Sequence, residues 1–164
     1  MIIIDNNILS TFAKIGRLDI LFRLFPQRQI AIVPAVYDEL RVGIRKGYVQ
    51  LEDVMAMVEK KSIRLITLTE AEIFLKPTLP VSFDEGELES VAVCKSREKP
   101  LLTNERSVKN WCIKEDIKYA DLPDLLRACW QSTVMSKKEV KSLIEDIEEK
   151  DNITFRSKEE IFND

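Results

Sequence analysis

Histidine is absent from this chain of 164 residues, and its absence removes a broad class of chemistry. A mechanism that needs an imidazole base, an imidazole metal ligand or a serine-histidine-aspartate relay cannot operate here. Glycine is also scarce: the four glycines form no glycine-rich loop, which excludes a phosphate cradle of the P-loop kind. Carboxylates remain as the candidate catalytic groups.

Cysteine is the next scarce residue. The three cysteines, Cys94, Cys112 and Cys129, include no Cys-x-x-Cys pair. Their odd number and their spacing argue against a disulfide framework and against a zinc site. Each lies among apolar residues in a helical pattern, so we expect small core residues and a reducing cytoplasm. The first apolar run ends at Asp5, too early for a signal peptide or a membrane span, so no membrane partner is expected.

What the chain does contain is the composition of an ordinary globular domain. Hydrophobic residues make up 45% and charged residues 32% of the sequence, and the formal net charge is −3. A chain of this length can bury roughly two thirds of the surface that its unfolded form exposes. Because the net charge is slightly negative, a polyanionic partner would need a local basic patch beside any acidic site.

Short apolar runs alternate with helical patterns along the chain. Strands are predicted at residues 2–4, 30–33, 63–68, 100–103 and 117–120. Helical crossovers between them predict an α/β fold of three layers, a mostly parallel sheet of about five strands with helices on both faces. We expect residues 1–132 to form this domain, and residues 133–164 to form a helical carboxyl-terminal extension packed on it.

Acidic residues follow these strands closely. Asp5 ends the first strand, Glu39 lies about one and a half helical turns after the second, and Glu105 follows the fourth directly. Glu87 lies in the first turn of the helix before strand four, and Asp121 ends the fifth strand. Ligands of open parallel sheets bind beyond the carboxyl ends of the strands. Carboxylates gathered there repel one another unless a divalent cation neutralises them, and oxygen ligands select Mg²⁺ or Mn²⁺.

Each acid also has a purely structural interpretation. Asp5 and Asp121 could be N-caps, which is the favoured reading for Asp121, and Glu105 could interact with a helix macrodipole. Glu87 could close a capping box with the acid three residues earlier, a motif worth about 1 kcal/mol. Glu39 could pair with a basic residue on its own helix. Spacing alone leaves both interpretations open.

Four stretches of the chain resemble motifs of the PIN-domain nuclease family, in particular the toxin-like members of prokaryotic toxin-antitoxin systems. The resemblance covers essentially the whole chain, and its tail, through Phe155-Arg156-Ser157 to Ile161, is similar to the carboxyl-terminal extension of one subgroup. The four stretches are Ile4 to Asn7, Val33 to Leu40, Asp84 to Ala92 and Leu101 to Arg106.

The resemblance implies a PIN-like fold and a Mg²⁺- or Mn²⁺-dependent endoribonuclease that hydrolyses RNA phosphodiesters. It also implies an antitoxin protein as a partner and a homodimer. The implied catalytic and metal-binding residues are Asp5, Glu39, Glu87 and Glu105. The implied supporting residues are Asn7, Thr103, Asn104 and Asp121.

One departure from the family pattern motivates a second hypothesis. Asn104-Glu105 occupies a place that is often Asp-Asp in the family. Glutamate carries one more methylene than aspartate, which shifts any coordination geometry, and Asn104 contributes no charge. The alternative function is therefore a catalytically weakened or inactive PIN-like module that binds RNA or protein.

An RNA substrate also needs basic residues, because phosphate contacts dominate its affinity. The candidates, which could equally be solvated helix faces, are Arg41, Arg45, Lys46, Arg106 and Lys109. Two further acids, Glu85 and Glu89, are expected to point to other faces of the Glu87 helix and to be solvated.

Two other reaction classes are disfavoured. A phosphatase with an aspartyl nucleophile needs a second aspartate two positions after the first, and this chain has Asn7 there. A phospho-receiver domain needs its acceptor aspartate after the third strand, where Thr67-Leu68-Thr69 stands.

Overall fold

A computed structural model describes all 164 residues of the chain. Five short strands form one sheet in the order β3-β2-β1-β4-β5, and every neighbouring pair is parallel. All five strands therefore present their carboxyl ends at one edge. The strands are β1 (Ile2–Ile4), β2 (Ile30–Ile32), β3 (Ile63–Leu65), β4 (Leu101–Leu102) and β5 (Tyr119–Ala120).

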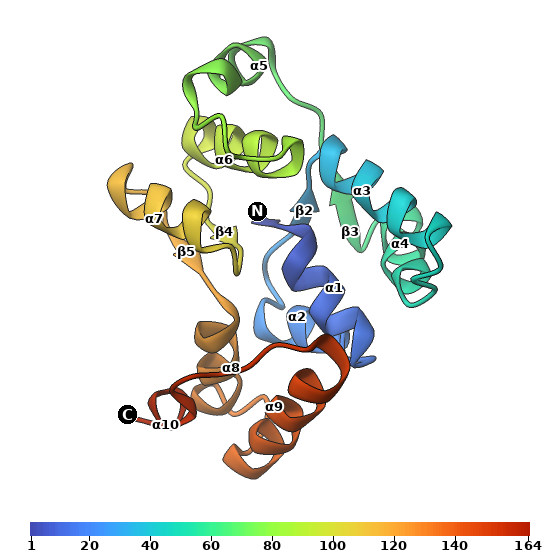
Figure 1. The fold of residues 1–164 in the computed structure, drawn as a ribbon, viewed down its shortest axis with the longest axis vertical. Coiled ribbons are helices and arrows are strands. Elements are labelled where there is room, and N and C mark those ends of the chain that lie inside the picture. Colours follow the sequence, from blue (N-terminus) through green and yellow to red (C-terminus); the bar gives the residue numbers. More distant parts are fainter.

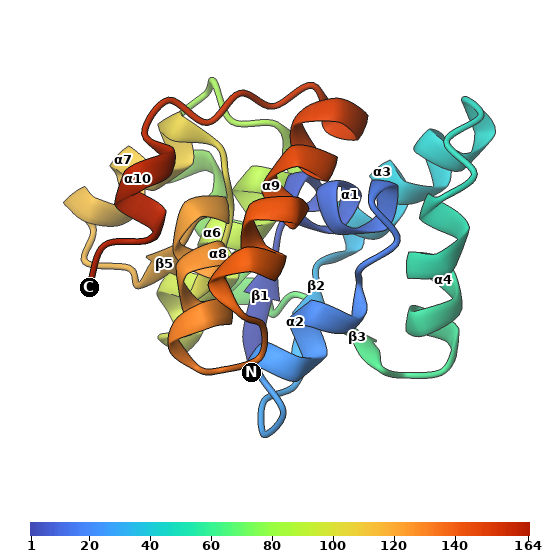
Figure 2. The same cartoon turned by 90° about the horizontal axis from the view of Figure 1, so that it is seen from below.

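Helices cover both faces of this sheet. Figures 1 and 2 show α5, α6 and α7 on one side, and α1, α2, α8 and α9 on the other. The three-layer α/β fold expected from the sequence is confirmed. The helices are α1 (Asn6–Lys14), α2 (Asp19–Leu24), α3 (Pro34–Arg45), α4 (Leu51–Glu59), α5 (Glu70–Leu75), the 3-10 helix η1 (Lys76–Thr78), α6 (Glu85–Arg97), α7 (Arg106–Lys114), α8 (Leu122–Gln131), α9 (Lys137–Asp151) and α10 (Lys158–Ile161).

The strands are shorter than the apolar runs predicted, most clearly at the third. β3 ends at Leu65, whereas the apolar run continues to Leu68. This strand lies at the edge of the sheet and pairs only with β2, and the Leu65 side chain is 41% exposed. With a partner on one side only, the chain leaves the sheet once β2 has ended.

The last helices share the core of the sheet domain. One continuous hydrophobic cluster includes Ile144, Ile147 and Ile161 together with the strands and α1. Asp151 at the end of α9 accepts hydrogen bonds from Thr11 and Lys14 of α1. The amino-terminal helix and the carboxyl-terminal extension are thus held together by apolar packing and by one charged contact.

Two further expectations concern the cysteines and the membrane. Cys94, Cys112 and Cys129 are free and buried, as the sequence predicted. No helix of the structure has the length and apolar content that crossing a bilayer requires.

Because the extension shares the core, truncation of Ile147 should destabilise the whole chain. This side chain is fully buried, and such isoleucine-to-alanine changes cost about 2 to 5 kcal/mol. Ile147→Ala should lower the urea midpoint in a single transition when followed by both tryptophan fluorescence and far-ultraviolet circular dichroism. Glu149→Ala, an exposed change in the same helix, should leave the midpoint nearly unchanged. Separate transitions for the two probes would show instead that the extension folds independently.

Candidate active site

The carboxyl edge of the sheet brings three polar positions together. Ile4 is in register with Leu102, and Leu102 with Ala120, so the residues that follow lie side by side. These residues are Asp5, Thr103 and Asp121. The edge predicted from the order of strands and acids therefore exists.

Asp5 lies at the centre of this edge and is 6% exposed. It is the N-cap of α1, and its Oδ1 accepts a hydrogen bond of 2.8 Å from the Asn6 backbone N–H. Its Oδ2 accepts from the Thr103 hydroxyl at 3.2 Å and from the Asn7 side-chain amide at 3.4 Å. These neutral donors hold the carboxylate in one orientation. Asp5 is therefore both a helix N-cap and a candidate site residue.

Glu39 reaches this edge from α3. Its carboxylate lies against the α-carbon of Gly86, and the nearby Gly86 backbone N–H and Asn6 side chain partly oppose the rise in its pKa. A Cβ at position 86 would collide with Glu39 Oε1, so the contact depends on glycine at this position. Here glycine permits a close approach rather than an unusual backbone angle.

Glu89 is bonded to the start of α3, the helix that carries Glu39, and is not the solvated acid expected from the sequence. It was predicted to be solvated, yet its side chain is only 12% exposed and accepts a 2.8 Å hydrogen bond from the Ala35 backbone N–H. That bond satisfies a free donor at the start of α3 and joins α3 to α6. Glu85, in contrast, is exposed and pairs with Lys76, as expected for an acid outside the site.

Glu87 closes a capping box and also faces the other acids. The Asp84 backbone N–H donates to Glu87 Oε2 at 2.9 Å, and the Glu87 backbone N–H donates to Asp84 Oδ1 at 2.8 Å. The structural interpretation of Glu87 is therefore correct. The same box places Asp84 close to the site, where its charge acts on Asp5, Glu39 and Glu87. From the sequence, Asp84 was expected only to cap the helix.

Burial and mutual repulsion perturb these acids strongly. Burial, followed by the charges of Asp84 and Glu105, raises the pKa of Asp5 to about 6. Burial, with the charges of Asp84 and Asp5, raises the pKa of Glu39 to about 7, and the same causes with Glu105 raise the pKa of Glu87 to about 7. None of these acids forms a salt bridge. The site carries negative charge without protein cations to balance it.

The chemistry of the donors fits a hard divalent cation. Asn6 lies next to Asp5 in the chain, and its side-chain oxygen is buried without a hydrogen-bond partner. Carboxylate and amide oxygens are the ligands that Mg²⁺ and Mn²⁺ prefer. No three acidic side chains stand close enough together to form a complete coordination group, and the Glu87 carboxylate is engaged by the Asp84 backbone N–H. The oxygen ligands are of the type that such an ion prefers, but they are not arranged in a complete coordination sphere.

The remaining acids differ in their surroundings. Glu105 is exposed, makes no capping hydrogen bond with its side chain, and donates its backbone N–H to the Thr103 hydroxyl at 3.2 Å. Asp121 is the N-cap of α8, and its Oδ2 accepts a 2.9 Å hydrogen bond from Lys109. The capping interpretation favoured for Asp121 is correct, and a lysine neutralises its charge.

Two asparagines connect the loops behind these acids. The Asn104 backbone N–H donates to Asn7 Oδ1 at 3.2 Å, and Asn104 Oδ1 accepts from the Leu122 backbone N–H at 3.4 Å. The amides therefore tie the end of β1 to the end of β4 and to the start of α8. Both act through hydrogen bonds and add no charge to the edge.

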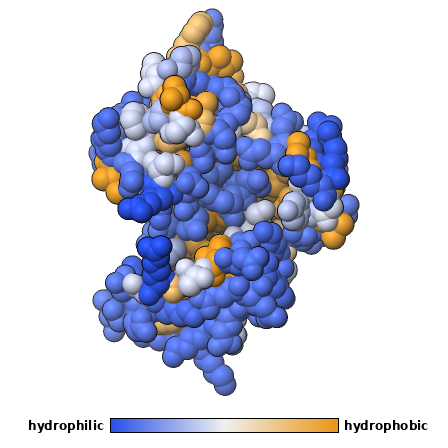
Figure 3. All heavy atoms as spheres, in the orientation of Figure 1, coloured by the Kyte–Doolittle hydropathy of each residue, from blue (hydrophilic) through white to orange (hydrophobic).

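The basic candidates lie on both sides of the acidic edge. Lys46 lines a surface depression together with Glu39 and Asn6. The Arg41 guanidinium lies 4.0 Å from Asp38 and above the ring of Tyr37. Arg45 and Arg106 are exposed and form no salt bridge, whereas Lys109 is engaged by Asp121. In Figure 3 an indentation with mostly hydrophilic walls separates the half that contains α6 and α7 from the half that contains α8 and α10.

Comparison with known proteins places this geometry in a family. A family model described as a PIN domain (DUF3368) matches residues 1–164. The chain is also similar to a chain in the crystal structure of VapBC2 from Rickettsia felis bound to a DNA fragment from their promoter. The two chains share 18% identity with a TM-score of 0.57, over 74% of this chain and 98% of the other. At that identity the likeness concerns the fold. No curated protein sequence gave a significant match.

The raised pKa of Asp5 predicts a pH-dependent gain in stability for Asp5→Asn. Unfolded aspartate ionises near pH 4, so between about pH 4 and 6 the folded protein keeps a proton that the unfolded chain releases. The stability from this group is complete below pH 4 and lost as the pH rises through 6. Removing the charge should therefore stabilise the metal-free protein at about pH 8 by roughly 1 to 2 kcal/mol, and by about half as much at about pH 5.

Urea unfolding in the presence of EDTA at the two pH values measures this difference. Asparagine keeps the capping geometry at position 5, so loss of the cap does not mask the effect. Equal stabilisation at both pH values, or destabilisation at the higher one, would show that Asp5 is not an uncompensated charge.

Proposed function

This chain belongs to the PIN-domain family, and from that premise we propose that it is a metal-dependent endoribonuclease that hydrolyses RNA phosphodiesters as the toxin of a toxin-antitoxin pair. One observation carries the proposal. Asp5, Glu39 and Glu87 converge at the carboxyl edge of the sheet with raised pKa values and without a basic partner. Carboxylates whose pKa values are strongly raised by desolvation and by neighbouring charge are candidates for a functional site.

The proposed ligands of Mg²⁺ or Mn²⁺ are Asp5, Glu39, Glu87 and Glu105. When bound, such an ion activates water for in-line attack on a phosphodiester and stabilises the leaving oxygen. Neighbouring residues of the chain position the proposed ligands. Thr103 and Asn7 donate to Asp5 and hold it in one orientation, and the missing side chain of Gly86 leaves room for the Glu39 carboxylate.

The substrate requires positive charge around the acids. Lys46 lies in the depression that contains Glu39, and Arg41, Arg45 and Arg106 are exposed near the acid-bearing elements. We assign these side chains to phosphate contacts on both sides of the edge. Lys109 acts mainly on Asp121, which it neutralises at 2.9 Å.

The proposed partners are a small antitoxin protein and a second copy of this chain, and we place the pair in the cytoplasm. VapBC2 is a complex, which supports a protein partner here by analogy. The depression around Glu39 is flanked by Val42 and Tyr48, which are 43% and 51% exposed. Apolar residues beside an acidic site suit a partner protein that covers the site.

Cleavage of a labelled single-stranded RNA tests the proposed activity. We expect cleavage with Mn²⁺, none with EDTA, and a fall of at least about a hundredfold in Asp5→Asn, because one lost ligand weakens the metal and its bound water. Glu59→Gln removes an exposed negative charge at the end of α4, just before β3 and away from the carboxyl edge of the sheet, and should cleave like the original protein. Cleavage that persists in both EDTA and Asp5→Asn would remove the proposal.

The second candidate is a PIN-like module without catalysis, and Glu105 motivates it. The Glu105 carboxylate is exposed and free of capping bonds, so its longer side chain has freedom to reach an ion or to remain in water. Metal binding by itself separates the two functions.

Calorimetric titration with Mn²⁺ makes this separation. The nuclease hypothesis predicts micromolar to millimolar binding that Gly86→Ala weakens about tenfold, because the added methyl group pushes the Glu39 carboxylate away. The added methyl group meets only the carboxylate of Glu39, which is the end of a flexible side chain and can move aside. Gly86→Ala should therefore keep nearly the full free energy of unfolding in urea. Heats that neither Gly86→Ala nor Asp5→Asn alters would favour the inert module.

A further inference from the structure

The carboxyl-terminal segment between α9 and α10 crosses the molecule at the edge toward which β1 points (Figure 2). Phe155 anchors it in the core, and its backbone N–H donates to Glu148 at 3.3 Å. On the far side, Ile161 is buried and its carbonyl accepts a 2.8 Å hydrogen bond from the Trp130 indole. The segment is therefore fixed at both ends.

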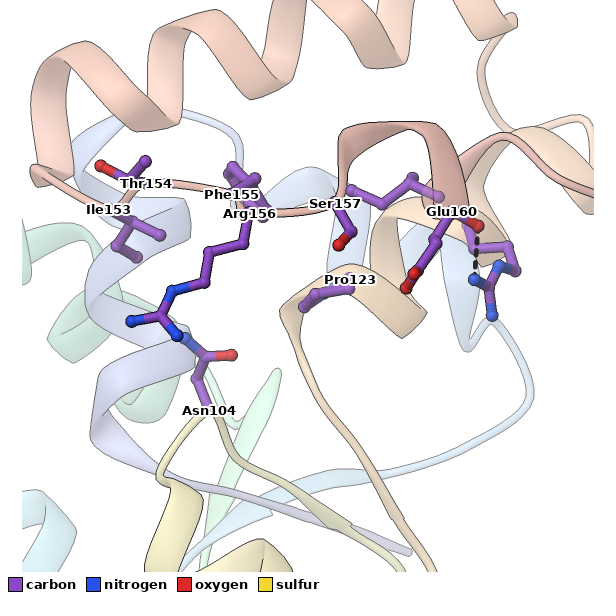
Figure 4. A pocket seen from close by; sticks show the side chains of 10 residues that line it. Asn104, Pro123, Ile153, Thr154, Phe155, Arg156, Ser157 and Glu160 are labelled. Atoms are coloured by element: carbon purple, nitrogen blue, oxygen red, sulfur yellow. Dashed lines mark hydrogen bonds between the residues drawn. The ribbon is translucent and has the colours of Figure 1, made fainter.

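Arg156 extends from this fixed segment toward the sheet edge. Figure 4 shows its guanidinium beside the Asn104 side chain, in a pocket between the segment and the start of α8. Arg156 is exposed and forms neither a salt bridge nor a hydrogen bond with the chain. By contrast, Lys109, which lies beside Asp121 at the same edge, is paired with that carboxylate.

Two further donors line the same pocket. Asn104 Oδ1 accepts from the Leu122 backbone N–H, which leaves the amide NH₂ of Asn104 on the side of Arg156. Arg127 Nε is buried without a partner, although the same guanidinium donates to the Glu160 carbonyl at 2.5 Å. The carboxylate of Glu160 is the pocket's own negative charge, and it forms no salt bridge with Arg156. The pocket thus has an excess of donors.

We propose that Arg156, with the Asn104 amide, binds a backbone phosphate of the RNA next to the cleavage site, so that the carboxyl-terminal extension completes the substrate-binding surface. This inference rests on the proposed nuclease function. A guanidinium presents a planar pair of donors to phosphate oxygens, and an amide NH₂ adds a third donor. Asn104 is two hydrogen bonds away from Asp5 through Asn7, so a phosphate held here lies along the same edge as the acids.

This arrangement gives a reason for asparagine, and not aspartate, at position 104. An aspartate at position 104 would place a carboxylate beside the Arg156 guanidinium and pair with it. Asparagine keeps the hydrogen bonds that join the loops while it leaves the guanidinium free for a ligand. The asparagine of the unusual Asn104-Glu105 pair is therefore consistent with an unpaired arginine in the carboxyl-terminal extension.

Fluorescence anisotropy with a labelled single-stranded RNA tests the proposal in an Asp5→Asn background, where cleavage does not interfere. We expect Arg156→Gln to weaken binding about fivefold to twentyfold and to lower the slope of log K against log[salt] by about 0.7, the value for one lost phosphate contact. Arg28→Gln is the matched control, because it removes one exposed positive charge from the loop before β2, at the opposite edge of the sheet.

Asn104→Asp provides the second variant. It should weaken RNA binding to a similar degree by sequestering Arg156, while Mn²⁺ affinity stays unchanged or rises. Equal behaviour of Arg156→Gln and Arg28→Gln would overturn the assignment of Arg156 while the Asp5-dependent cleavage of RNA still stands. Failure of the original protein to bind or cleave RNA would remove both the assignment and the proposed function.

Discussion

Asp5 is a buried carboxylate without a basic partner, and the rest of the site is arranged around this charge. It lies where β1 ends, between β2 and β4, so parallel pairing brings the ends of those strands beside it. Only neutral donors contact it. Because no lysine or arginine offsets the charge of Asp5, the nearby charges of Asp84 and Glu105 raise the free energy of the folded protein until a cation or protons bind.

The acids at this edge contribute to stability as well as to the site. Asp5, Asp84 and Asp121 each cap a helix, and the Asp84–Glu87 pair forms a capping box. Capping requires a short acceptor at a helix start, and in a parallel α/β fold helix starts follow the carboxyl ends of strands. The structural and functional interpretations of these residues therefore do not exclude one another.

The carboxyl-terminal extension links stability to the edge of the sheet. Apolar residues of α9 and α10 join the common core, and Phe155 holds the connecting segment in place. Packing of this kind orients a neighbouring side chain at little cost, since the backbone is already fixed by buried contacts on both sides of it. Arg156 is presented at the site through this packing rather than through hydrogen bonds of its own.

The sequence by itself determined the five strands along the chain, their parallel arrangement and most helix starts, because local periodicity and capping depend on neighbouring residues. It missed the short β3, the hydrogen bond of Glu89 to the start of α3, and the parts played by Asp84 and Asn6. Those features depend on contacts between segments far apart in the chain. Whether Glu39 meets Gly86, whether Lys109 neutralises Asp121 and where Arg156 points were decided only by the tertiary structure. The packing of α3 on α6, the pairing of β4 with β5 and the packing of the extension on the core set these contacts.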